Sequence, residues 1–272
     1  MRLVFLCAKR ASPARFFISK QGILVMKKLQ EIIGPLIDLG EIGVASAHPD
    51  DEVSHGHGIT IARSLGANVH HLIYTKGKVS TKNYAQAQGI SVERGDRVYE
   101  AHAGALALGM TTATILDYED GGLQNQIQEA VEATITWGLE QNIHTFMTLG
   151  PIDDHADHNA TRTIALHAAT RLNAFGHVTS ILEVRHKNEG DIHAAATDNS
   201  VAAIFRNLRA HSSQARLSDD PVANWNAVPG GLYMHPDDMA EFAQYPLLVD
   251  ASYIHYSADK LTLPGIGKLI LR

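Results

Sequence analysis

Two short stretches gather acidic and histidine side chains in a chain whose charged residues make up only 19% of the total. They are SAHPDDE at residues 46–52 and DDHADHN at residues 153–159. In the first, His48 and Asp51 are three positions apart, and Pro49 stiffens the chain between them. If a strand ends before them and a tight turn follows, both side chains converge on one point. Such a pair suits metal binding or catalysis.

The second stretch carries two histidines at helical spacing. His155 and His158 are one turn apart, so they can face the same side of a helix that continues through Asn159–Leu172. Each stretch taken alone has a simpler explanation, because acids such as Asp50 and Asp51 also cap a helix N-terminus and interact with its dipole. Three consecutive acids in the first stretch nevertheless exceed what a cap requires.

Taken together, the two stretches supply one group for each task in metal-assisted hydrolysis. Two histidines and one carboxylate suit a divalent transition metal that keeps open positions for water and substrate. A bound Zn²⁺ lowers the pKa of its water to about 7 and polarises a carbonyl oxygen. A further carboxylate serves as general base, and a protonated histidine stabilises the oxyanion and protonates the leaving amine. Because Cys7 is the single cysteine, a metal site here must use nitrogen and oxygen ligands.

The chain between and after the two stretches alternates short β-rich runs with longer helical patterns. This alternation predicts an α/β fold: a Rossmann-like, mostly parallel sheet flanked by helices, with a loop-rich C-terminal region. Ligands of such sheets lie beyond the carboxyl ends of the strands, and both stretches follow a predicted strand, so we expect them at one rim. The predicted strands are Ile42–Ala47, Val69–Tyr74, Ala113–Leu116, His144–Thr148 and Thr179–Val184, and the predicted helices are Gly58–Leu65, Val92–Leu108, Gln124–Glu140, Asn159–Leu172 and Ser200–Gln214.

Both ends of the chain lie outside this alternation. Residues 1–40 are predicted to form an N-terminal extension with an amphipathic lead-in, and residues 41–272 the folded domain. The N-terminal residues are rich in Lys and Arg and contain no acid before Glu31, so a transit-like peptide is the alternative to a loosely attached extension. The Gly-, Pro- and Asp-rich stretch Ser218–Gly231 is expected to form loops, such as a flap over the site.

Composition excludes several classes of partner. A net charge of −6 gives no basic footprint for nucleic acid or an anionic membrane. No apolar run approaches the ~20 residues that span a bilayer. With no clean export signal and one cysteine, we expect a cytoplasmic protein that acts on a small molecule. The sequence leaves homo-oligomer formation open.

The hexapeptide AHPDDE at Ala47–Glu52, at the end of a first strand and followed by a distal HxDH, resembles the LmbE-like/PIG-L family of N-acetylglucosaminyl deacetylases. The resemblance runs from about Glu41 to Gln214, which is most of the domain. Four ordered matches argue against coincidence. Those after the hexapeptide are RVYEAHAGALALGM (Arg97–Met110), DYEDGGL (Asp117–Leu123) and RAHSSQ (Arg209–Gln214).

The resemblance implies a role for each residue of the two stretches. His48, Asp51 and His158 would ligate the metal, for which Zn²⁺ is expected and Fe²⁺ is the alternative. Asp50 would be the general base acting on the metal-bound water. His155 would be the histidine that stabilises the oxyanion and acts as general acid.

Three more residues acquire expectations from the resemblance. Asp157 would lie next to His155 and support it without itself contacting the substrate or the metal. Arg97 and Asp120 fall where the family contacts the sugar or its attached group. The alternative for Arg97 is an ion pair within its helix, with Glu100, and the alternative for Asp120 is a turn-forming role.

Other residues of these motifs are expected to have structural roles. His211 and Gln214 of the RAHSSQ segment are expected to form structural hydrogen bonds rather than take part in catalysis. Glu52 is left to a capping or supporting role. His55 and His57 occupy a stretch that is usually glycine-rich in the family, and we expect them to face solvent or to support the site.

The expected function is removal of the N-acetyl group from an N-acetylglucosamine-type conjugate through a metal-activated water. One alternative is the same chemistry on a non-sugar or glycopeptide N-acyl substrate. Another is a catalytically inactive, sugar-binding relative, although such a protein is expected to have lost Asp50 or a ligand, and none is missing. An Fe(II) oxygenase is disfavoured because its ligands have HxD spacing on antiparallel barrels, whereas this chain has HxxD in an α/β pattern.

Overall fold

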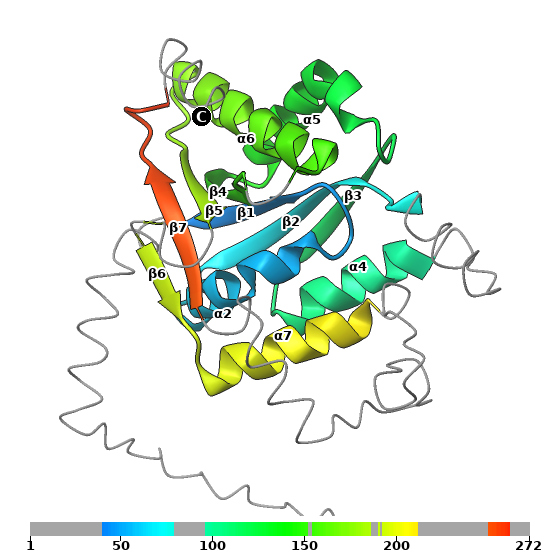
Figure 1. The fold of residues 1–272 in the computed structure, drawn as a ribbon. Helices are drawn as coiled ribbons and strands as arrows, with labels where there is room; N and C mark the ends of the chain where they lie inside the picture. Colours follow the sequence, from blue (N-terminus) through cyan, green and yellow to red (C-terminus); the bar gives the residue numbers. More distant parts are fainter. Residues whose placement is uncertain are drawn as a thin grey trace, which may run out of the picture. The chain divides into compact units, whose positions relative to one another are not determined.

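The computed structural model describes residues 40–78, 96–151, 154–185, 190, 192–211 and 250–261. These residues build a seven-stranded sheet with the strand order β3-β2-β1-β4-β5-β7-β6 (Figure 1). Strands β1 to β5 pair in parallel, whereas β7 pairs antiparallel with both β5 and β6. The strands are β1 (Glu41–Ser46), β2 (Asn68–Thr75), β3 (Thr112–Tyr118), β4 (Ile143–Leu149), β5 (Ser180–Arg185), β6 (Ile192–Ala195) and β7 (Asp250–Tyr256).

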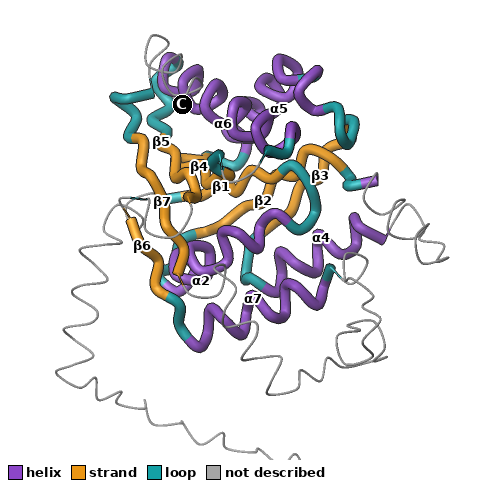
Figure 2. The backbone as a smooth tube through the Cα atoms, viewed as in Figure 1, coloured by secondary structure: helices purple, strands orange, loops and turns teal. Residues whose placement is uncertain are grey.

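Helices lie on both faces of this sheet. Helices α5 and α6 cover one face, and α2, α4 and α7 lie on the other (Figures 1 and 2). Two short 3₁₀ helices, η1 and η2, follow strands at the sheet's rim. The helices are η1 (Asp51–His55), α2 (Gly56–Ser64), α4 (Asp96–Ala107), η2 (Leu123–Asn125), α5 (Ile127–Glu140), α6 (Ala156–Ala174) and α7 (Asp198–Ala210).

The central strands are buried on both faces, which is typical of parallel strands between two helical layers. In β1, Ala45 joins Leu72, Trp137 and Phe146 in the main apolar core, to which α5 and α6 contribute. Gly43 leaves room for the indole of Trp137, because a Cβ at this glycine would lie 2.8 Å from the ring. The carboxyl ends of β1 and β4 are thereby held by a packed core.

The strand order reverses between β1 and β4, which are neighbours in the sheet although they are far apart in the chain. In open α/β sheets such a reversal leaves a crevice beyond the carboxyl ends, where ligands bind. Strand β1 leads into AHPDDE, and β4 leads into the segment before HADH. The topology therefore brings the two motifs to one place.

The predicted α/β architecture is confirmed. All five predicted strands exist and pair in parallel, and each predicted helix has an observed counterpart among the described residues. Strands β6 and β7 were not predicted, and β7 lies in the region expected to be loop-rich. Residues 1–39 and 218–231 lie outside the described residues, so the predicted extension, the domain division and the flap stay predictions. Among the described helices, none has the length and apolar character needed to cross a membrane.

Candidate metal centre and active site

The first motif folds back on itself immediately after β1. The carbonyl oxygen of His48 accepts hydrogen bonds from the amides of Asp50 (3.0 Å) and Asp51 (3.4 Å). In return, Oδ2 of Asp51 accepts a hydrogen bond from the amide of His48 at 2.8 Å. This closed turn explains why a histidine and an aspartate three positions apart point toward the same place.

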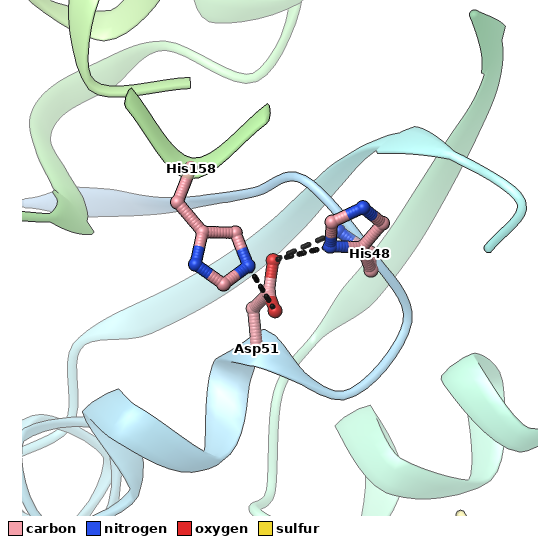
Figure 3. Close-up of side chains that lie close together, drawn as sticks. All are labelled: His48, Asp51 and His158. Atoms are coloured by element: carbon pink, nitrogen blue, oxygen red, sulfur yellow. Dashed lines mark hydrogen bonds and ion pairs between the residues drawn. The ribbon is translucent and has the colours of Figure 1, made fainter. Parts of the chain in front are cut away.

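The two motifs meet at the carboxylate of Asp51 (Figure 3). Its Oδ2 lies 3.6 Å from Nδ1 of His48, and its Oδ1 lies 3.3 Å from Nε2 of His158. The three side chains can each offer one ligand atom, and these atoms lie within 4.8 Å of one another. Two imidazole nitrogens and one carboxylate oxygen fit a divalent transition metal with open positions. The three predicted ligands are therefore close enough together for that role.

His155 lies next to this group, at the start of α6. Its ring stacks on His158 with centroids 4.5 Å apart, and it meets the ring of His48 edge-on at 4.9 Å. Its Nδ1 accepts a hydrogen bond from the amide of Asp157 at 3.2 Å and so caps the helix. A neutral imidazole that accepts at Nδ1 carries its proton at Nε2. His155 is exposed, as a residue that must reach a substrate would be.

Asp157 is fully buried and ties a neighbouring loop to the site. Its carboxylate accepts hydrogen bonds from the amides of Gly121 (2.7 Å) and Leu123 (3.0 Å) and contacts Nε2 of His48 at 3.2 Å. The sequence predicted it as the neighbour of His155. Its amide contacts His155 and its carboxylate contacts His48, and a role in supporting His155 stays a prediction.

Asp120 also contacts His48, with Oδ1 3.3 Å from the same Nε2. Burial works against a positive charge on His48, but Asp120, Asp157 and Asp51 outweigh it and raise the pKa of His48 to about 12. Burial likewise opposes the charge on Asp51, yet His158 and His48 hold its pKa well below the usual range. In the metal-free protein a proton on His48 therefore balances the carboxylates, and a cation would take its place.

Arg97 meets the first motif from α4. Its buried guanidinium forms an ion pair with Oδ1 of Asp50 at 2.9 Å. It also donates hydrogen bonds to the carbonyl oxygens of Pro49 and Gly77, both at 2.9 Å. Desolvation by the surrounding protein outweighs the attraction of Arg97, and together with the Asp51 carboxylate it raises the pKa of Asp50 to about 6.

Glu52 is fully buried behind the site. Its Oε1 accepts hydrogen bonds from Nδ2 of Asn207 (2.7 Å) and from Nε2 of His211 (2.6 Å), which lie at the end of α7. Burial opposes ionisation of Glu52, but His211 outweighs it and lowers the pKa to about 2. Sequence reasoning assigned Glu52 and His211 supporting roles without finding that they are partners. The sequence did indicate that the two residues are important, because each belongs to a motif that resembles the family.

His55 and His57 do not face solvent, which was one of the two expectations for them. Both are buried: His57 shares a hydrogen bond with Ser200 at 2.8 Å, and His55 stacks on Tyr253. The reason is that η1 and α2 run beneath the sheet toward α7 and β7. Neither histidine belongs to the groups of potential metal ligands among the described residues.

Comparison with protein families gives a match at residues 44–169 to the PIG-L family, described as GlcNAc-PI de-N-acetylase. The matched segment contains both motifs. This part of the chain is similar to the PIG-L, or LmbE-like, deacetylase family, which confirms the resemblance based on its motifs. A comparison with curated protein sequences finds no match.

Solved structures with the same fold include several deacetylases. One is the N,N'-diacetylchitobiose deacetylase from Pyrococcus horikoshii, with 16% identity, coverage of 92% of this chain and 97% of that chain, and a TM-score of 0.59. Another is the deacetylase of the antimicrobial A40926 pseudoaglycone, with 17% identity, coverage of 81% and 98%, and a TM-score of 0.57. At these identities the likeness establishes a shared fold.

The same fold also occurs in an enzyme with a different reaction. The 4-carboxy-2-hydroxymuconate hydratase from Pseudomonas putida KT2440 is 14% identical, with coverage of 80% and 96% and a TM-score of 0.50. The fold alone therefore does not define the reaction, and the argument for a function must come from the site.

Proposed function

We propose that this protein is a metal-dependent N-deacetylase that converts an N-acetylglucosamine-type conjugate and water into acetate and a free amine. The observation that carries the proposal is the meeting of His48, Asp51 and His158 beyond the carboxyl ends of β1 and β4. The match of residues 44–169 to a deacetylase family and the deacetylases among the solved structures of this fold support it.

In this proposal His48, Asp51 and His158 hold the cation, Zn²⁺ or alternatively Fe²⁺. A bound divalent cation supplies a water that ionises near neutral pH and polarises the acetyl oxygen. The proposed ligands come from a turn after β1 and from the first turn of α6. Both are fixed at their strand or helix ends, as a preorganised site requires.

Asp50 is the proposed general base. With a pKa of about 6 it is ionised at neutral pH and still basic enough to accept a proton from the attacking water. The water oxygen adds to the acetyl carbon while Asp50 takes this proton. Arg97 fixes the orientation of the Asp50 carboxylate through their ion pair at 2.9 Å.

His155 is the proposed oxyanion-stabilising group and general acid. Its protonated form, in which Nδ1 no longer accepts from the amide of Asp157, would neutralise the charge that develops on the acetyl oxygen. It then gives a proton to the sugar nitrogen as the C–N bond breaks, which releases the amine and leaves acetate. Its exposure and its contacts with His48 and His158 support this role.

Arg97 and Asp120 were expected to contact the sugar or its attached group, and that role stays a prediction. Their observed contacts support a different one, because Arg97 holds Asp50 and Asp120 contacts His48. A cytoplasmic location and a small-molecule partner likewise stay predictions.

A glycopeptide N-acyl substrate is the second candidate, favoured by the A40926 pseudoaglycone deacetylase of the same fold. The experiment is an acetate-release screen with chelator-stripped and Zn²⁺- or Fe²⁺-loaded protein on N-acetyl amino sugars, N-acyl glycopeptides and simple N-acetyl amines. Acetate and amine in equal amounts from an amino sugar support the proposal. Hydrolysis confined to glycopeptides supports the second candidate, and no hydrolysis by metal-loaded protein contradicts both.

A further inference from the structure

Glu52, the last residue of AHPDDE, is held by a helix that contributes none of the proposed catalytic groups. Its carboxylate oxygen Oε1 receives two hydrogen bonds from α7 and its C-cap, from Asn207 at 2.7 Å and from His211 at 2.6 Å. Asn207 and His211 are four positions apart and so lie on one helical face. Because Glu52 directly follows Asp51 in η1, whatever fixes Glu52 also fixes the backbone that carries Asp51.

Helix α4 packs so closely against this contact at Gly104 that it leaves no room for a side chain there. A Cβ at Gly104 would lie 2.4 Å from Nε2 of His211, 2.6 Å from Oε1 of Glu52 and 2.9 Å from Nδ2 of Asn207. Real Cβ atoms essentially never come within 3.0 Å of such atoms. Two turns earlier on α4, Arg97 forms an ion pair with Asp50 and donates a hydrogen bond to the carbonyl oxygen of Pro49. Contacts from α4 and α7 therefore fix residues 49–52.

As a purely structural feature, the buried pair of Glu52 and His211 carries a large desolvation cost. A buried ion pair is often no more stabilising than apolar side chains of the same volume. What the contact of Glu52 with His211 does fix is η1, the turn that carries Asp51 and follows Asp50.

We propose that His211 and Asn207 are positioning residues for the reaction: acting through Glu52, they fix η1 so that Asp51 faces His48 and His158. They touch neither substrate nor metal in this account. The proposal deepens the proposed function and rests on it for the assignment of Asp51 as a ligand. Loss of the His211 contact is expected to loosen the ligand carboxylate, and with it the adjacent Asp50.

The experiment compares His211→Leu, which removes the donor, with His211→Gln, which keeps an amide donor near the position of Nε2. Zn²⁺ is titrated into the chelator-stripped full chain, and kcat and KM are measured on any substrate that the acetate screen identifies. His211→Leu is expected to weaken Zn²⁺ affinity and to lower kcat by about tenfold to a hundredfold, with KM little changed. His211→Gln is expected to recover most of both losses.

Thr197→Ala is the matched control. Thr197 caps the other end of α7 through Ser200, so this variant destabilises the same helix without touching Glu52. It is expected to lower Tm while leaving Zn²⁺ affinity and kcat of the folded protein unchanged. If His211→Leu likewise lowers only Tm, the positioning role is wrong.

Two further results keep the test decisive. If His211→Leu does not fold, His211→Ala takes its place in the comparison with His211→Gln, and wild-type Zn²⁺ affinity in His211→Ala overturns the proposal. Zn²⁺ affinity does not depend on the choice of acyl substrate, so a loss of affinity supports the positioning role even if no amino sugar is hydrolysed. A wild-type protein that binds no Zn²⁺ or Fe²⁺ contradicts the proposed function itself.

Discussion

At the scale of single residues, three adjacent acids have three different environments. Desolvation by the surrounding protein, together with the neighbouring Asp51 carboxylate, outweighs Arg97 and raises the pKa of Asp50 to about 6. Asp51, between two histidines, has a pKa well below its usual range, and Glu52, bound to His211, has a pKa of about 2. Environments that separate the pKa values of neighbouring carboxyl groups are a mark of acid–base sites. This separation matches the proposed division into base, ligand and anchor.

Asp50→Asn tests the proposed base. The amide keeps the size of the side chain but cannot accept the water's proton, so kcat is expected to fall by about 10²–10⁴-fold with the bound metal retained. Acetate release and metal content are the measurements, and Glu129→Gln, an exposed acid on α5, is the control with expected wild-type values. Near-normal turnover in Asp50→Asn would show that another group takes the proton.

The raised pKa of His48 predicts how metal binding depends on pH. The metal binds neutral imidazole, so binding must expel the proton that Asp120, Asp157 and Asp51 hold on His48. Because that pKa is about 12, affinity should still rise about tenfold per unit between pH 7 and 9, where an ordinary histidine with a pKa of about 6.5 is already neutral.

The measurement is Zn²⁺ affinity by competition with a chelator across that pH range, together with calorimetry in buffers of different ionisation enthalpy to count released protons. Asp120→Asn removes one of the carboxylates and should make the pH dependence shallower. An affinity that is constant above pH 7 in the wild-type protein would contradict the assigned charge on His48.

At the scale of elements, the site depends on how closely α4 and α7 approach the turn after β1. Arg97 and Gly104 lie seven residues apart on α4 and face the same turn, one with a guanidinium and the other with no side chain. Both belong to the matched segment RVYEAHAGALALGM, although the sequence alone did not show why a glycine stands in a helix. The close approach supplies the reason.

Gly104→Ala tests this packing. In an exposed helix the change would stabilise by about 1 kcal/mol, because alanine is the better helix former. Here the added Cβ overlaps His211, Glu52 and Asn207, so we expect a net loss of about 1–3 kcal/mol in the free energy of unfolding. Chemical denaturation measures it.

Gly138→Ala on α5 is the comparison variant. Its Cβ would meet Leu172 and Phe146 at 3.3 Å, which small shifts can accommodate. We expect a much smaller effect there. Equal effects of the two substitutions would mean that the cluster around Glu52 adjusts more freely than its distances indicate.

At the scale of the whole molecule, the order of the strands in the sheet brings the two motifs together at one site. The five parallel strands were predictable because each is a short β-rich run between helical patterns. The placement of both motifs at one rim followed from the rule for open α/β sheets. Strands β6 and β7 were missed, since an antiparallel pair at a sheet edge depends on partners that local patterns do not reveal.

The candidate site likewise has one part that local sequence patterns predict and another part that they do not. The spacing of His48 with Asp51 and of His155 with His158 showed that each pair could converge, because a turn or a helix fixes it locally. The contact between Glu52 and His211 joins residues 159 positions apart, and no local pattern encodes it. The contacts of Asp120 and Asp157 with His48 likewise arise only when the loop before η2 meets α6.

The most direct test of the central claim is acetate release from N-acetyl amino sugars, measured before and after the metal is removed by a chelator. The account predicts equal amounts of acetate and free amine from metal-loaded protein, loss of both after chelation, and recovery when Zn²⁺ or Fe²⁺ is returned. Full activity in metal-free protein, or no hydrolysis of any amino sugar by metal-loaded protein, would contradict it.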